Sequence, residues 1–102
     1  MKIRSLDETK AALRLLLTLY EMRDNPPDRM TILRTLKMKY GVDTTAAYTA
    51  IRICEQLGLF ETTEKKFGRQ PRASIIHHLT KKGMEIAKRI AEINEILEKD
   101  IT

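Results

Sequence analysis

The chain has 102 residues, 42% of them hydrophobic, and 19 Lys and Arg against 14 Asp and Glu give it a net charge of +5. The single cysteine, Cys54, excludes an intrachain disulfide and a multi-cysteine zinc site. No apolar run is as long as a membrane span, which needs about 18 residues, and none has the pattern of a signal peptide. We therefore expect one cytoplasmic domain with its own core and without a membrane partner.

The positive charge is concentrated in the middle of the chain. Residues 29–82 hold eleven Lys and Arg against four Asp and Glu, a local charge of +7, whereas residues 1–28 balance at zero and residues 83–102 carry −2. This distribution is typical of a nucleic-acid surface on a neutral scaffold, although uneven solvation explains it equally well. Only four residues are Asn or Gln, which resembles a thermophile's composition.

The first predicted helix begins at "SLDE", where Ser5 and Glu8 have the spacing of a capping box, and ends near Asp24. Its apolar residues form two stripes at helical spacing: Leu13, Leu16, Leu17 and Tyr20, and Ala12, Leu15, Leu19 and Met22. One stripe serves the domain core. The other needs a second partner, so we expect Leu15 and Leu19 in a subunit interface.

A helix-turn-helix pattern follows. After a short strand at Met30 and Thr31, a second helix capped by Asp28 or Thr31 is predicted to run through Tyr40 and to end at Gly41. A third helix begins only a few residues later. Two helices joined by three or four residues with a glycine are typical of this motif.

The third helix, from Asp43 or Thr44 to about Leu57, has two distinct faces. Small and apolar residues share one face: Ala47, Ala50, Ile51, Cys54 and Leu57. Polar groups that can donate hydrogen bonds to phosphates or bases share the other: Thr45, Tyr48, Thr49, Arg52 and Gln56. An ordinary solvated helix face is the alternative interpretation.

Two β-like runs, "LGLFETTEKK" and "RASIIHHLT", are separated by the Gly and Pro of "FGRQPR" and predict a hairpin. The charged residues at its tip are all basic: Lys65, Lys66, Arg69 and Arg72. An arginine on a constrained tip can enter a narrow minor groove, where the negative potential is enhanced. Neutralising phosphates releases counterions, so we expect salt-dependent binding.

A long helix, capped by Thr80, is predicted to close the chain. Ile86, Ile90, Ile93 and Leu97 step by four, three and four residues, which is the spacing of a coiled-coil seam. Such an arm exceeds what one small core needs. We therefore expect these four residues, with Leu15 and Leu19, to form the interface of a homodimer.

The segment "ICEQLGLFETTEKK", continued by "RASIIHHLTKKGMEIA", resembles MarR- and PadR-type winged-helix transcriptional regulators, and the long last helix resembles small archaeal winged-helix proteins. The resemblance covers roughly residues 28 to 90. It implies an α+β winged helix-turn-helix over residues 1–80, with residues 81–102 as a dimerisation helix.

The resemblance also implies a function, a homodimer that binds double-stranded DNA and regulates transcription. The third helix would enter the major groove through Thr44, Thr45, Tyr48, Thr49 and Arg52. The wing would reach the minor groove through Lys65, Lys66, Arg69 and Arg72. Because Arg52 is the only basic residue of the third helix, backbone and shape recognition would contribute strongly, and a low-specificity architectural role is an alternative.

Other classes of function fit the sequence less well. His77 and His78 would point to opposite faces of a strand and cannot chelate one metal ion together, and no catalytic motif or cofactor-binding loop is present. A small-molecule effector is possible in this family, but no residue pattern supports one. The main rival is a winged-helix module that docks proteins, for which Ile53 and Phe67 are the only favourable residues.

Overall fold

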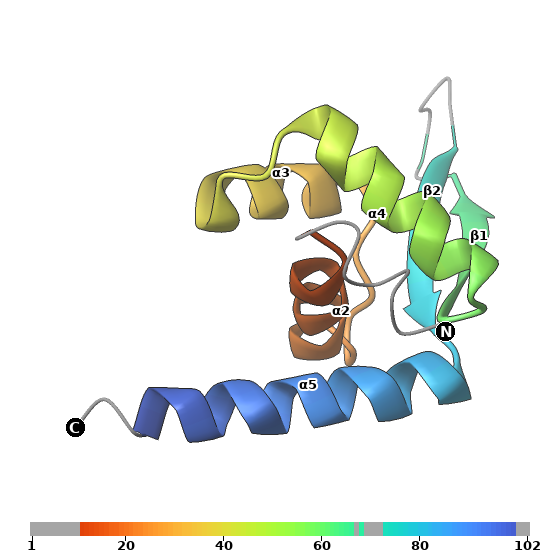
Figure 1. Ribbon diagram of the computed structural model, residues 1–102. Coiled ribbons are helices and arrows are strands. Elements are labelled where there is room, and N and C mark those ends of the chain that lie inside the picture. Colours follow the sequence, from red (N-terminus) through yellow and green to blue (C-terminus); the bar gives the residue numbers. More distant parts are fainter. Residues whose placement is uncertain (1–10, 67, 69–72, 100–102) are drawn as a thin grey trace.

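The computed structural model describes residues 11–66, 68 and 73–99, and the predicted capping box of Ser5 and Glu8 lies outside them. The element order is α2 (Ala11–Glu21), α3 (Arg29–Tyr40), α4 (Thr44–Gln56), β1 (Phe60–Lys65), β2 (Ser74–Leu79) and α5 (Lys81–Lys99). Figure 1 shows α2 at the centre, α3 and α4 above it, the hairpin to one side and α5 crossing below. This is the α+β winged helix-turn-helix architecture expected from the sequence.

The helix α2 is the centre of the core. Its residues Leu15, Leu16 and Leu19 are at most 2% exposed, because α5 packs on one side of the helix and α3 and α4 pack on the others. The hydroxyl of Thr18 is buried as well and donates to the carbonyl of Arg14 at 2.8 Å, so this polar group is satisfied inside the helix. Both apolar stripes of α2 therefore contain buried residues, and α5 of the same chain is one of the helices that cover them.

Aspartates begin both helices of the helix-turn-helix. Asp28 accepts a hydrogen bond from the backbone N–H of Thr31 at 2.9 Å, and Asp43 accepts one from Ala46 at 2.8 Å. Between the helices, Gly41 has a φ of 68° and lets the chain turn in the left-handed region. These local signals explain why the predicted bounds of both helices agree closely with the structure.

The predicted short strand at Met30 and Thr31 is wrong. Both residues lie in the first turn of α3, because Asp28 caps the helix just before them. The segment just before α3 contacts strand β2 of the hairpin instead, through an isolated β-bridge between Asp28 and Ile76. The backbone N–H of His77 also donates to the carbonyl of Pro27 at 3.0 Å.

The hairpin pairs β1 and β2 antiparallel, from Phe60 opposite Leu79 to Lys65 opposite Ser74. Thr80 then caps α5, since its hydroxyl accepts from the backbone N–H of Gly83 at 3.0 Å. The first half of α5 packs on the core through Ala87, Ile86 and Ile90. No helix in the described ranges is both long and apolar enough to span a bilayer.

Candidate nucleic-acid interface

The outer face of α4 is polar and open to solvent. Thr44, Thr45, Tyr48 and Arg52 are exposed, and Thr49 is half-buried. The orientation follows from the opposite face, where small and apolar side chains are buried in the core: Ala47, Ala50, Ile51 and Cys54. The hydroxyl of Thr49 donates to the carbonyl of Thr45 at 3.0 Å, so it can only accept a further hydrogen bond.

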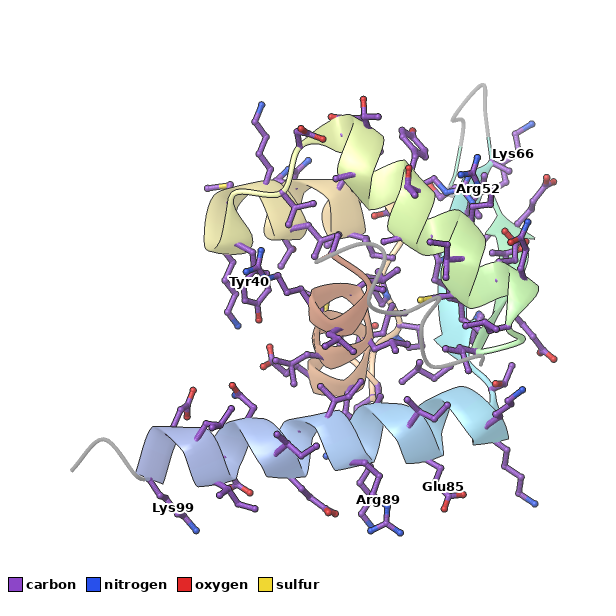
Figure 2. The ribbon with its side chains drawn as sticks, in the orientation of Figure 1. Tyr40, Arg52, Lys66, Glu85, Arg89 and Lys99 are labelled. Carbon is purple, nitrogen blue, oxygen red and sulfur yellow. The ribbon has the colours of Figure 1, made fainter. Side chains whose placement is uncertain are left out.

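Both the hairpin and α4 carry exposed cations. In the view of Figure 2, Arg52 on α4 and Lys66, just beyond β1, are seen toward the same edge. Lys65 is also exposed at the end of β1. Arg69 and Arg72, the other two predicted wing contacts, lie outside the described residues. Arg52 and Lys66 are thus exposed cations on two separate parts of the chain.

The helix α3 adds cations that the prediction of site residues did not include. Arg34 and Lys37 are exposed one turn apart on α3, the helix that precedes α4. Lys39 is held differently: its ammonium lies 3.1 Å from a carboxylate oxygen of Glu21 on α2, and this hydrogen bond raises the pKa of Lys39. The i, i+3 spacing of Arg34 and Lys37 was visible in the sequence, but their exposure depends on how α3 packs.

The two histidines of β2 have opposite environments, as their alternation on a strand predicts. His77 is 1% exposed, whereas the Nε2 of His78 lies 2.9 Å from the Thr63 hydroxyl at the surface. Burial, and then the nearby Arg29 guanidinium, lowers the pKa of His77 to about 4. The described residues contain no cluster of three His, Cys, Asp or Glu side chains that could hold a metal ion.

Cys54 lies on the buried face of α4. Burial raises the pKa of its thiol to about 12, so the side chain is protonated and packs as a small hydrophobic group.

The residues predicted for the dimer interface fall into three groups. Leu15 and Leu19 are buried within one chain and have no surface to offer a partner, so their assignment to a subunit contact is wrong. Ile86 and Ile90 pack partly on the same core. Only Ile93 and Leu97 are largely exposed, at 58% and 61%, and Ile96 beside them is 59% exposed.

The exposed end of α5 therefore contains an apolar patch that the heptad spacing only partly identified. Ile96 was missed because it falls outside the four-three-four pattern. Its position three residues after Ile93 places it on a neighbouring part of the helix surface.

No family model and no curated protein matches the sequence. The structure, in contrast, resembles several solved ones. The protein smu.1704 of Streptococcus mutans aligns with a TM-score of 0.75 at 17% identity, over 91% of this chain and 87% of its own. A PadR-like transcription factor of Bacteroides fragilis aligns with a TM-score of 0.65 at 14% identity, over 99% and 96% of the two chains. The fold is a PadR-like winged helix.

A transcriptional regulator of Streptococcus aligns at a TM-score of 0.69 and 13% identity, over 87% of this chain and 89% of its own. These alignments cover most of each chain, so the winged helix and its long last helix belong to one shared architecture. In winged-helix terms, α3 and α4 are the helix-turn-helix, β1 and β2 are the wing, and α5 is the closing helix.

Proposed function

We propose that this winged-helix protein binds double-stranded DNA as a homodimeric, sequence-dependent regulator of transcription. In this proposal α4 enters the major groove with Thr44, Thr45, Tyr48, Thr49 and Arg52. The wing follows the minor groove with Lys65, Lys66, Arg69 and Arg72. The observation that supports it best is that Arg52 of α4 and Lys66 beyond β1 are both exposed, and that they are seen toward the same edge in the view of Figure 2.

The energetics of this arrangement are mainly electrostatic. The α4 face has one cation and several hydroxyls, so few base edges can be read by charged bidentate pairs. Arg34 and Lys37 of α3 extend the basic surface and are suited to contact phosphates. Each phosphate contact releases counterions, so affinity should fall steeply with salt.

The exposed apolar residues at the end of α5 support the proposed homodimer. Ile93, Ile96 and Leu97 leave apolar surface in water that a second α5 would bury, and burial of apolar surface stabilises association. The interface would be restricted to this half of the helix, because Leu15 and Leu19 are already buried in the core. A two-fold axis there would duplicate α4 and its wing, which matches recognition of two half-sites.

The names of the structural neighbours agree with this function. One similar structure is a transcriptional regulator and another is a PadR-like transcription factor, and neither name describes an enzyme. At 13% and 14% identity the similarity indicates the fold alone. The proposal of DNA binding therefore depends on the basic surface of this chain.

A protein-docking module is the second candidate, and exposed apolar side chains favour it. Met38 is 80% exposed, Met30 is 63% exposed on the same helix, and Tyr48 is 46% exposed on α4. Methionine-rich surfaces adapt to several protein partners. The net positive charge around these residues argues against a protein-docking module.

Titration of a labelled random-sequence duplex at a series of salt concentrations separates the two candidates. DNA binding predicts a linear fall of log affinity with log salt, and selection of bound sites from random DNA should then yield a paired-half-site sequence. An absence of binding at low salt would favour docking. Binding that is salt-dependent but equal on every sequence would instead indicate an architectural protein.

A further inference from the structure

His77 is a buried, neutral imidazole whose proton can be placed on one nitrogen. Its ring packs edge-on against Phe60, with centroids 4.9 Å apart, and its Nε2 accepts a hydrogen bond from the Nε–H of Arg29 at 3.3 Å. A neutral imidazole has one donor and one acceptor nitrogen. Because Nε2 is the acceptor here, Nδ1 carries the proton.

This Nδ1–H donor has no acceptor among the residues that the structure describes. Buried donors in folded proteins are almost always paired, because leaving one unpaired costs the hydrogen bond that it made to water. The side chain is 1% exposed, so bulk water does not supply the acceptor. An acceptor is therefore expected within the molecule, next to the ring.

His77 is among the residues that line a cavity of about 110 Å³. The apolar wall of this cavity comes from Leu19 of α2 together with Met22, Pro26, Leu79 and Met84, and its other lining residues are Arg23 and His78. No Asp or Glu is among the described residues that line it. The volume is below the about 300 Å³ of a typical drug-sized site, and it suits a molecule of several heavy atoms.

Arg23 is held in a defined position beside this cavity. One of its Nη1–H groups donates to the carbonyl of Tyr20 at 2.7 Å, and the guanidinium lies 4.1 Å from the centroid of the Tyr20 ring. A guanidinium has five N–H donors, so others remain for a ligand. Two kinds of donor, one neutral and one cationic, thus border a space that is otherwise lined by His78 and by apolar residues.

We propose that this cavity binds a short-chain monocarboxylate. The carboxylate accepts the Nδ1–H of His77 and an N–H of Arg23, and the aliphatic tail packs against Leu79 and Met84. A carboxylate fits better than a neutral alcohol because it satisfies both donors and balances the Arg23 charge. It also fits better than a bare inorganic anion, because five of the lining residues are apolar.

The position of the cavity gives such a ligand a route to the DNA-binding surface. The backbone N–H of His77 donates to the carbonyl oxygen of Pro27 at 3.0 Å, and Ile76 forms the bridge with Asp28, the N-cap of α3. A ligand on the His77 ring therefore contacts the strand that ties the wing to the helix-turn-helix. This regulatory consequence rests on the proposed function, whereas the binding itself does not.

The test titrates butanoate, with 1-butanol as the neutral control, into the ¹⁵N-labelled full chain without DNA. We expect saturable shifts of the His77 ring nitrogens with butanoate and at least about tenfold weaker binding of 1-butanol, from the loss of hydrogen bonds to a charged group. His77→Phe, which keeps a ring against Phe60, and Arg23→Gln should each weaken butanoate binding by about tenfold or more. Arg14→Gln is the matched control, because Arg14 of α2 lies over the Tyr40 ring of α3 and is not among the residues that line the cavity, so its loss should leave binding unchanged.

Several outcomes would overturn the site. They are the absence of saturable shifts, equal binding of 1-butanol and butanoate, and unaltered butanoate binding in Arg23→Gln. The Arg23→Gln variant tests the site even if His77→Phe does not fold. Where binding is found, a change of DNA affinity by about fivefold at saturating butanoate supports the coupling to the wing. An unchanged DNA affinity would contradict the coupling. Binding of butanoate without any binding of DNA would contradict only the proposed function.

Discussion

Gly83 of α5 lies directly against the backbone of Leu59, so closely that a Cβ at this position would overlap the Leu59 carbonyl oxygen. The same oxygen accepts a hydrogen bond from the Thr80 N–H at 3.1 Å, which fixes where α5 begins relative to the hairpin. Glycine is therefore required here by close packing between two backbones, in a helix where alanine would otherwise be preferred.

Gly83→Ala should destabilise the protein by about 1–3 kcal/mol or more, because steric overlap with backbone outweighs the better helix propensity of alanine. Denaturant unfolding followed by circular dichroism measures the change. Lys88→Ala, at an exposed position of the same helix, should alter the free energy of unfolding by less than about 0.5 kcal/mol. A Gly83→Ala variant as stable as the parent would show that α5 can shift away from Leu59.

Stability should fall between pH 6.5 and about pH 4 because of His77. The unfolded chain takes up a proton near the ordinary pKa of 6.5, while the folded protein resists protonation until about pH 4, so the unfolded state binds more protons in this window. The loss amounts to about 3 kcal/mol. Besides burial and Arg29, nearby His78 lowers the pKa of His77 and Asp28 raises it.

Thermal unfolding across this pH range measures the effect, and His77→Phe should remove most of it. The pKa of Asp28 is lowered below 3.8 by its hydrogen bonds to Thr31, so its contribution is lost only at still lower pH. An equally steep pH dependence in His77→Phe would assign the loss to another group.

For the wing, Arg69→Ala combined with Arg72→Ala should weaken binding to every duplex. The slope of log affinity against log salt should become shallower by about 0.9 for each phosphate that the variant no longer neutralises. Fluorescence anisotropy at several salt concentrations gives both the affinity and the slope. Glu61→Gln, at an exposed position of β1, serves as a control because it removes a negative charge and should not weaken binding. Unchanged affinity in the double variant would place the wing away from DNA.

Arg52→Ala should act differently, by changing the preference among DNA sites. If Arg52 reads guanine with two hydrogen bonds, the variant should lose about 1–3 kcal/mol of discrimination at that base pair. Competition between the selected site and single-base variants measures it. Equal weakening on all sequences would mean that Arg52 contacts only phosphate.

Ile93→Glu combined with Leu97→Glu should yield monomers in sedimentation experiments, because carboxylates cannot be buried in an apolar helix contact. Lys88→Glu changes the net charge by the same amount on the same helix and should leave the dimer intact. Ile90 is unsuitable for this test, since it also packs on the core of its own chain. A dimer that persists in the double variant would contradict an interface at the end of α5.

The local features of the fold were predictable from sequence. Asp28 and Asp43 as helix caps, Gly41 as the helix end and Thr80 as the cap of α5 all act through residues within a few positions of each other. The polar face of α4 was equally predictable, because one apolar stripe at helical spacing determines which residues remain outside.

The assignment of Leu15 and Leu19 failed for a different reason. Two apolar stripes show that a helix has two partners, but periodicity does not distinguish a neighbouring helix of the same chain from one of another subunit. The packing of α5 along α2 decides this, and it depends on contacts between residues far apart in sequence.

The sequence alone determined the order of the helices and the hairpin, the positions of the helix caps to within a few residues, and the polarity of each face, because these depend on neighbours within one or two turns. It did not determine the structure at Met30 and Thr31, where the predicted strand is part of α3. The tertiary structure decided that α2 is enclosed, that His77 is a neutral donor beside a cavity, and that Gly83 meets Leu59. Those properties arise when distant segments exclude water from a shared space, and no local pattern specifies which segments will meet.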